Sequence, residues 1–197
     1  MRDDVDAPEK FDGRWRGTTR VALVSRGDVD HLIKKHYLGK WPGVCVLSLG
    51  MFVSDVAVGV IVFALPPRET QKRYGGGVCW ELARLWIDDS IPRNAETFLI
   101  SKAVKYIKKN HPDVCVLVSY ADPSAGHSGV IYKAANWICD GRTDQERKTP
   151  RFDYSCAKTG KKFSRRKHVP AGTVITRIPR VSKFRFVYIL KRRHENQ

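Results

Sequence analysis

Short apolar runs separated by polar segments follow one another along most of the chain. Their length and composition are typical of β-strands, and they cover residues 20–26, 44–49, 56–65, 79–88, 114–118 and 183–192. The runs 44–49 and 56–65 are joined through Ser54-Asp55, a polar pair that suits a hairpin turn. We therefore predict a β-sheet in which these two strands are antiparallel neighbours.

Two segments between these runs have the spacing of amphipathic helices. The first begins at Gly27-Asp28, ends near Gly39, and carries its apolar stripe at Val29, Leu32, Ile33 and His36. The second carries its stripe at Ala95, Leu99, Ala103 and Ile107. Helices that alternate with strands in this way predict an α/β protein.

The strand at residues 79–88 carries charged and aromatic side chains among its apolar residues. Simple alternation puts Trp80, Leu82, Arg84 and Trp86 on one face, and Glu81, Ala83, Leu85 and Ile87 on the other. The segment before it, residues 68–77, contains Gly75-Gly76-Gly77 but no Lys-Ser/Thr pair after the glycines, which a phosphate-binding loop requires. We predict a flexible loop there, with a lid as one role.

The stretch from Ser119 to Trp137 is the richest in chemistry. It follows a buried strand that Asp122-Pro123 breaks, because proline cannot donate a ladder hydrogen bond. A polar turn over residues 124–129 then leads into a short helix with Ser128, Tyr132 and Asn136 on one face. The carboxyl end of a strand beside a helix start is a common ligand site in α/β proteins. The alternative is a polar loop between a core strand and a packing helix.

Composition limits the class of protein. The chain has 197 residues with 42% hydrophobic content, which is enough for a folded domain with its own core. No apolar run is long enough to span a bilayer, and the N-terminus lacks the apolar core of a signal peptide. The five cysteines form no Cys-x-x-Cys pair, which argues against structural zinc. We expect a cytoplasmic protein without a membrane partner.

Positive charge is concentrated toward the C-terminus. The net charge is +16, and residues 141–197 hold 17 Lys+Arg against 4 Asp+Glu, whereas residues 1–140 hold 19 against 16. Such a local excess favours a polyanion, with nucleic acid as the first candidate. We therefore predict a loose N-terminal arm over 1–19 and one domain over 20–197. This domain would include a basic insertion at about 141–182, which opens with a turn over 140–143.

Basic and aromatic residues are interleaved inside this insertion. Phe152, Tyr154 and Phe163 stand among the cations, an arrangement that suits phosphate contacts and base stacking. The candidate DNA-binding residues are Lys158, Lys161, Lys162, Arg165, Arg166 and Lys167. The alternative is a solvated basic loop.

The order of predicted elements resembles the GNAT acyltransferase fold. That resemblance implies a mixed central sheet flanked by helices, with a V-shaped opening beside the fourth and fifth strands. It also implies a donor signature, Gln/Arg-x-x-Gly-x-Gly/Ala, at the start of the helix that follows the fourth strand. Residues 90–96 of this chain read Ser-Ile-Pro-Arg-Asn-Ala-Glu and do not match the signature, which argues against acetyl-CoA. Arg93 and Asn94 are the cofactor-binding candidates in this stretch.

A more specific resemblance is to the Mom DNA-modification proteins of Mu-like phages. It is carried by His36-Tyr37, Tyr120-Ala121-Asp122-Pro123, Gly126-His127, Gly129, Ile131-Tyr132 and Asn136-Trp137, and it covers most of residues 20–192. It implies conversion of adenine in duplex DNA to a carbamoylmethyl derivative on its exocyclic amine, which shields phage DNA from restriction. The implied setting is the host bacterial cytoplasm, with double-stranded DNA and a host donor metabolite as partners.

This activity suggests roles for the candidate catalytic residues, which are His36, Tyr37, Tyr120, Asp122, Ser124 and Tyr132. An enzyme reaches an adenine amine by extruding the base from the duplex. Asp122, or else His36, would accept an amine proton, and Ser124 with the helix N-terminus would stabilise charge on the donor. The three tyrosines would orient substrate or act as acids.

Cofactor and rival functions stay open at this level. Iron is one candidate cofactor, with His36, Tyr37, Asp122 and His127 as conceivable ligands whose spacing is not diagnostic. One rival function is a conventional acetyl-CoA-dependent N-acetyltransferase. The other is a nucleic-acid-binding protein without catalytic activity, which would explain the charge but not the residues around Asp122.

Overall fold

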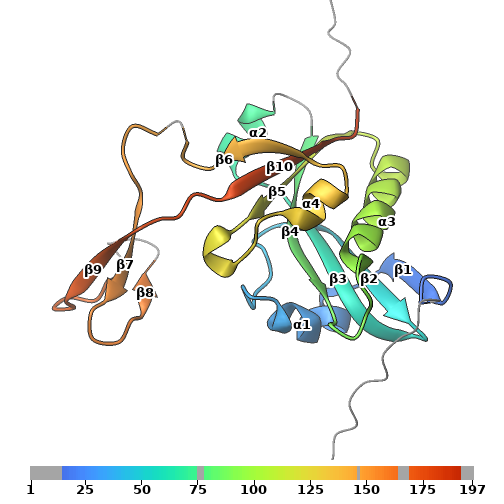
Figure 1. Ribbon diagram of the computed structural model, residues 1–197, viewed down its shortest axis with the longest axis horizontal. Coiled ribbons are helices and arrows are strands. Elements are labelled where there is room, and N and C mark those ends of the chain that lie inside the picture. The colour runs from blue at the N-terminus through green and yellow to red at the C-terminus, as the bar shows by residue number, and fades with distance from the viewer. Residues whose placement is uncertain (1–14, 75–77, 146, 164–168, 192–197) are drawn as a thin grey trace, which may run out of the picture.

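The computed structural model describes residues 15–74, 78–145, 147–163 and 169–191 of the chain. In this part, seven strands form one mixed sheet in the order β1-β2-β3-β4-β5-β10-β6 (Figure 1). The strands are β1 (Thr19–Leu23), β2 (Cys45–Val53), β3 (Val56–Ala64), β4 (Val78–Ile87), β5 (Val114–Ala121), β6 (Ile138–Arg142) and β10 (Phe184–Ile189). Neighbours are antiparallel except β4 and β5, which are parallel.

The predicted hairpin between β2 and β3 is confirmed. It turns at Ser54 and Asp55, whose φ angles are +46° and +63°. Positive φ at both central residues is the geometry of a type I′ turn, whose twist matches that of the flanking strands.

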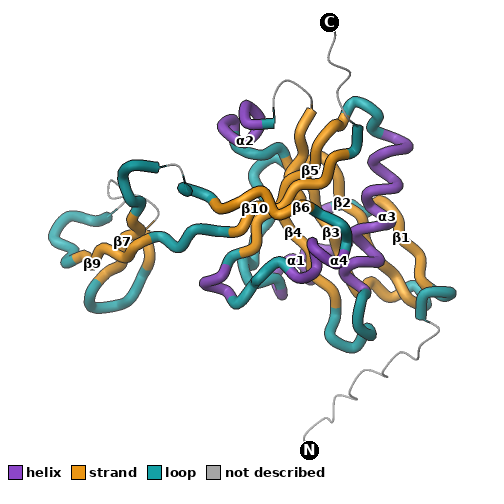
Figure 2. Tube along the Cα trace, turned by 45° about the horizontal axis from the view of Figure 1, so that its top comes forward, coloured by secondary structure: helices purple, strands orange, loops and turns teal. Residues whose placement is uncertain are grey.

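Helices cover both faces of the sheet, as Figures 1 and 2 show. Helix α1 (Arg26–Lys35) buries Val29, Leu32 and Ile33 against β3, and Ser25 caps its N-terminus. On the other face, α3 (Ala95–Asn110) buries the predicted stripe in the main core beside the short helix α4 (Val130–Ala134). No helix in the described ranges is long and apolar enough to cross a membrane.

A β-bulge in β4 overturns part of the predicted face assignment. Phe63 pairs with Leu82 and Val62 pairs with Arg84, so Ala83 is an extra residue on the β4 side. Because the bulge shifts the alternation by one, Leu82 lies in the main core while Arg84 faces the α1 side, where its side chain contacts the Lys40 carbonyl. Alternation alone could not reveal this.

Two segments predicted as loops or turns are regular elements. Residues 68–77 were expected to form a flexible loop, but Arg68–Arg73 is helix α2, and residues 75–77 lie outside the described part. The predicted turn at 140–143 is also wrong, because Ile138–Arg142 forms the edge strand β6 and pairs with β10. Whether such a short polar segment forms a strand depends more on the strand beside it than on its own composition.

The described part of the expected N-terminal arm, residues 15–19, packs against the fold. Trp15 is 4% exposed, and its ring meets the ring of Phe98 on α3 edge-on at 5.2 Å. The hydroxyls of Thr18 and Thr19 donate to the Trp15 carbonyl oxygen, and β1 begins at Thr19. Residues 1–14 lie outside the described part.

The basic insertion forms a small sheet of its own. Strands β7 (Phe152–Cys156), β8 (Lys162–Phe163) and β9 (Ile175–Pro179) pair in the order β8-β7-β9. Figures 1 and 2 show this sheet standing away from the main sheet, joined to it through β6 and β10. Backbone bonds between Thr143 and Lys183 and between Arg151 and Arg180 pair the two connecting segments. We call residues 143–183 the arm.

Candidate active site

A cavity of about 930 Å³ opens where β4 and β5 separate. Their parallel ladder runs from the pair Val78–Val114 to the pair Glu81–Val118, and the strands part beyond it. The carboxyl-terminal halves of both strands line the cavity, together with residues 36–38, α2, the loop between β5 and α4, and the start of the arm. The structure thus shows the V-shaped opening expected beside the fourth and fifth strands.

Three aromatic rings from distant parts of the chain meet at the cavity. Tyr37, which follows α1, lies with its ring centroid 4.5 Å from that of His36 and 4.9 Å from that of His127 in the loop after β5. All three line the cavity, and Tyr37 is 49% exposed. An exposed ring between two imidazoles offers a flat apolar surface on which a planar base can stack.

The hydrogen bonding of His36 fixes which of its nitrogens carries the proton. Its Nδ1 accepts from the Leu38 backbone N–H at 3.1 Å. Burial lowers the pKa of His36 to about 4, helped by the charges of Arg84 and His127, so the ring is neutral near pH 7. A neutral imidazole that accepts at Nδ1 keeps its proton on Nε2. In this geometry Nε2 is a hydrogen-bond donor.

Tyr132 is held at the floor of the opening. Its hydroxyl lies 2.8 Å from the Ser119 hydroxyl, which is also 2.8 Å from the Leu82 carbonyl oxygen on β4. Burial raises the pKa of Tyr132 to about 12, although the bond to Ser119 opposes that shift. The phenol is therefore neutral, and it ties α4 to both strands at the point where they part.

Glu81 is a cavity residue that sequence reasoning placed on a strand face but not in the site. Glu81 lines the cavity, and burial raises the pKa of its carboxyl, although the charges of Arg84 and Lys183 oppose that shift. No hydrogen bond or ion pair to Glu81 is formed by the described residues. The signal available in the sequence was an acidic residue inside an apolar strand. Acidic side chains are rarely buried without a partner.

Asp122 and Ser124 lie beside the cavity and are not among the residues that line it. The Asp122 carboxylate accepts from the Ser124 backbone N–H at 3.0 Å and from its hydroxyl at 2.6 Å, and it pairs with Lys183 at 2.9 Å. Burial raises the pKa of Asp122, but these contacts outweigh burial and lower it overall. Asp122 thereby orients Lys183, which does line the cavity.

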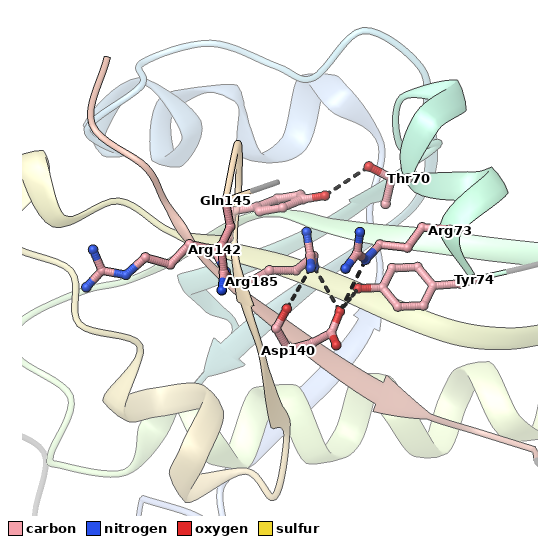
Figure 3. Close-up of polar contacts among 8 residues, drawn as sticks. Thr70, Arg73, Tyr74, Asp140, Arg142, Gln145 and Arg185 are labelled. Carbon is pink, nitrogen blue, oxygen red and sulfur yellow. Dashed lines mark hydrogen bonds and ion pairs between the residues drawn. The ribbon is translucent and has the colours of Figure 1, made fainter. Parts of the chain in front are cut away.

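A second polar cluster supports the opposite wall (Figure 3). Asp140 on β6 accepts from Arg185 Nε at 2.9 Å and from the Tyr74 hydroxyl at 2.6 Å, with Arg73 Nε at 3.6 Å. Tyr120, a predicted site residue, lines the cavity and shares a 2.9 Å hydroxyl–hydroxyl bond with Thr70 on α2. These contacts connect α2, β5, β6 and β10 across the mouth.

Comparison with known proteins identifies the family to which this chain belongs. The model of the Mom protein family matches residues 18–197. The chain belongs to the Mom protein family. A curated relative, the methylcarbamoylase mom of Escherichia phage Mu, is 37% identical over 112 residues, which is 52% of this chain and 45% of that protein. The chain thus matches about half the length of this Mom relative.

Solved structures show that this Mom family member has a GNAT-like fold. A GNAT family acetyltransferase from Elizabethkingia anophelis with acetyl-CoA bound has a TM-score of 0.53 at 10% identity, covering 87% of this chain and 98% of that one. The ribosomal-protein-S18-alanine N-acetyltransferase of Escherichia coli has a TM-score of 0.51 at 9% identity, covering 91% and 98%. At such identities these likenesses show the fold alone.

The described members of two predicted residue sets, the DNA-binding and the cofactor-binding candidates, do not line the cavity. Lys158, Lys161 and Lys162 are exposed on the arm, whereas Arg165, Arg166 and Lys167 lie outside the described residues. Arg93 and Asn94, the cofactor candidates before α3, are exposed and do not line the cavity.

The residues around the start of α3 fit a phosphate-rich cofactor poorly. Glu96 stands in the first turn of α3, and Asp88 on the approach accepts from both the backbone N–H and the hydroxyl of Ser90. Anionic side chains there repel a pyrophosphate that a helix N-terminus would otherwise attract. Among the described residues, no cluster of three or more His, Cys, Asp or Glu side chains is arranged to hold a metal ion. The iron candidate and the argument against acetyl-CoA both stay untested.

Proposed function

We propose that this Mom family member modifies adenine in duplex DNA by adding a carbamoylmethyl group to the exocyclic amine, protecting phage DNA from host restriction. The support is its membership of the Mom family and the methylcarbamoylase name of its phage Mu relative. The observation that carries the chemistry is Glu81, which lines a cavity walled by aromatic rings and forms no hydrogen bond or ion pair with the described residues. We place the enzyme in the cytoplasm of the infected bacterium.

Glu81 is the general base of this proposal. A general base must lie in the site, be free to accept a proton and have a pKa nearer to neutrality than an ordinary carboxylate. Glu81 lines the cavity, and burial raises its pKa. Asp122 fits this role less well, because Ser124 and Lys183 occupy its oxygens and lower its pKa. We therefore propose that Asp122 and Ser124 position Lys183.

The transfer is a substitution at carbon. The donor, a host metabolite, carries an electrophilic carbamoylmethyl carbon bonded to a leaving group. The adenine N6–H bond breaks as the N6–C bond forms, Glu81 takes the proton, and the electron pair of the broken donor bond departs with the leaving group. His36, as an Nε2–H donor, stabilises negative charge that develops on the donor.

The aromatic residues hold the reacting base. Tyr37 and His127 provide the stacking surface for an adenine flipped out of the duplex, and each such stack contributes about 1–3 kcal/mol. Tyr120 on β5 and Tyr132 on α4 orient the base edge. The role given to Tyr37 is thus a surface rather than an acid.

The arm provides the contact with the DNA backbone. Lys158, Lys161 and Lys162 are exposed, and the Arg177 guanidinium stacks on Phe152 at 4.0 Å from the ring centroid. At the root of the arm, Arg151 and Lys183 line the cavity. Phosphates bound along the arm would therefore bring the duplex to the mouth.

Nucleoside mass spectrometry on plasmid DNA from bacteria expressing the protein tests this function. We expect a deoxyadenosine heavier by a carbamoylmethyl group with the wild-type protein, and none with Glu81→Gln. The matched control is Glu69→Gln, an acid on α2 at the rim of the same cavity, which should retain most of the modification. A modified nucleoside in the Glu81→Gln sample would remove Glu81 as the base. An unmodified wild-type sample from soluble protein would contradict the reaction, and acetyl-CoA binding would then favour the rival N-acetyltransferase acting on a protein or small amine.

A further inference from the structure

Two charged residues are buried in the described part of the chain, and they differ in how their charge is compensated. Arg84 and Arg185 are each 8% exposed, and both line the cavity. Arg185 donates from Nε to the Asp140 carboxylate at 2.9 Å, so its charge has a partner. Arg84 forms no ion pair with any described residue.

Arg84 is nevertheless held rigidly. Its Nε donates to the Lys40 carbonyl oxygen at 2.7 Å, and its Nη1 donates to the Ala83 carbonyl oxygen at 2.6 Å. Two neutral carbonyl groups orient the guanidinium without cancelling its charge. The β4 bulge is what places the side chain here, because strict alternation would have put it on the opposite face.

An oriented, buried cation that has no ion pair among the described residues is costly unless something supplies negative charge at short range. A buried charge is normally paired, and a planar guanidinium matches the two oxygens of a carboxylate or phosphate. Tyr37 and then Glu81 are the acidic groups with the largest electrostatic effect on the Arg84 pKa, yet neither forms an ion pair with Arg84 among the described contacts. The cavity beside Arg84 is the place from which an anion could approach.

We propose that Arg84 binds an anionic oxygen, of a carboxylate or a phosphate, on the small-molecule donor of the reaction. This inference rests on the proposed function, since it assigns the donor to the same cavity. It names the donor's chemical class as an anion that enters the space between β4 and the loop after α1. The Glu81 carboxylate and the anion site would then lie three residues apart on one strand.

A DNA phosphate is the other source of the same chemistry, and burial argues against it. The cations at the rim are much more exposed, with side-chain exposures of 39% for Arg73, 47% for Arg151 and 37% for Lys183. A duplex backbone therefore meets these residues before it can reach Arg84. A small anion can enter the cavity.

The test measures binding of small anions by the protein without DNA. Inorganic pyrophosphate and malonate serve as the phosphate and carboxylate probes, and the signal is the fluorescence of the tryptophans, with Trp86 in the cavity wall. We expect at least one probe to bind with saturation. Arg84→Met should weaken that binding at least tenfold, and Arg84→Lys, which keeps the charge but loses the planar fork, should weaken it less. Arg20→Met is the matched control, because Arg20 pairs with Asp55 at the far edge of the sheet.

Each outcome decides the inference. Equal probe binding by wild-type and Arg84→Met protein, or no saturable binding of either probe by the wild type, would overturn it. A loss of affinity for a short duplex oligonucleotide in Arg84→Met, with probe binding unchanged, would assign Arg84 to DNA phosphate instead. If Arg84→Met does not fold, Arg84→Gln keeps an N–H donor for the Lys40 carbonyl and removes only the charge. Because no modified nucleoside enters this measurement, the anion site can stand or fall separately from the reaction.

Discussion

Three side chains in or beside the cavity have pKa values that their local surroundings shift in different directions. Glu81 and Asp122 are both carboxylates, but burial dominates the first and raises its pKa, while contacts with Ser124 and Lys183 lower the pKa of the second. His36 is uncharged because burial lowers its pKa to about 4. One base that can accept a proton, one fixed anion and one neutral donor follow from these environments.

Glu81→Gln should abolish modification and stabilise the protein. A carboxyl whose pKa is raised by folding stabilises the folded state below its unfolded pKa, and that contribution is lost as pH rises through the folded pKa. At pH 7.5, where the carboxyl of the wild type must be buried in its charged form, the substitution should therefore raise the Tm. The difference should shrink toward about pH 4, near the ordinary pKa of glutamate. Calorimetry at both pH values checks this, and a lower Tm at pH 7.5 would contradict it.

Asp122→Asn and Lys183→Met should reduce modification by similar factors, and the double variant should lose little more. The reason is that the 2.9 Å ion pair makes Lys183 the group through which Asp122 acts. Initial rates of nucleoside formation for the four proteins of this cycle provide the measurement. A complete loss with Asp122→Asn alone, beside a mild effect of Lys183→Met, would restore Asp122 as the proton acceptor.

At the scale of elements, the short loop and helix after β5 are held by close contact with β10. Gly129 precedes α4 with φ of +80°, and a Cβ there would collide with the ring of Phe186. That ring also stacks on Tyr132 at 5.1 Å, so the contact sets the position of a site residue. Only glycine combines the backbone angle with the missing side chain.

Gly129→Ala should therefore destabilise the protein much more than Gly126→Ala. Both glycines have similar φ angles, +80° and +76°, but a Cβ at Gly126 meets nothing within 4 Å. The left-handed backbone alone costs about 1–2 kcal/mol for alanine, and the clash with Phe186 adds about 1–3 kcal/mol. Urea denaturation of the two variants isolates the clash as the difference. Equal destabilisation would show that Phe186 moves aside without cost.

At the scale of the whole molecule, the exposed lysines of the arm and the cavity lie apart, and the root of the arm connects them. The small sheet of the arm stands away from the main sheet (Figures 1 and 2). The arm carries the exposed Lys158, Lys161 and Lys162, whereas the cavity opens between β4 and β5 of the main sheet. Arg151 and Lys183 belong to the arm and also line the cavity. DNA affinity and catalysis should therefore respond to different substitutions.

Replacing Lys158, Lys161 and Lys162 with Ala should weaken binding to any duplex and reduce its salt dependence. Each phosphate contact that is lost lowers the slope of log K against log salt by about 0.9. Fluorescence anisotropy over a range of KCl concentrations gives that slope. The control replaces Lys102, Lys105 and Lys109, three exposed lysines on α3, and should leave the slope unchanged. Equal effects of the two triple variants would mean that the arm has no special part in DNA binding.

Periodicity predicted much of the main sheet, because strands and helices that bury one face must repeat their apolar residues at fixed spacing. The β2–β3 hairpin, the α1 and α3 stripes and the strand before Asp122 follow from that rule. The stretch from Tyr120 to Tyr132 was also visible, because a proline, glycines and hydroxyls end a strand there. Elements without such a period, α2 and β6, were missed.

The sequence by itself determined the α/β class, the local excess of positive charge and the family to which the chain belongs. Each of these depends only on residue types and their order along the chain. Only the tertiary structure decided which polar groups share the cavity. The bulge at Ala83 turned Arg84 toward α1, and the parting of β4 from β5 exposed Glu81 beside Tyr37. Contacts with Ser124 and Lys183 engaged the carboxylate of Asp122. These outcomes depend on distances between residues far apart in the chain, which local pattern does not specify.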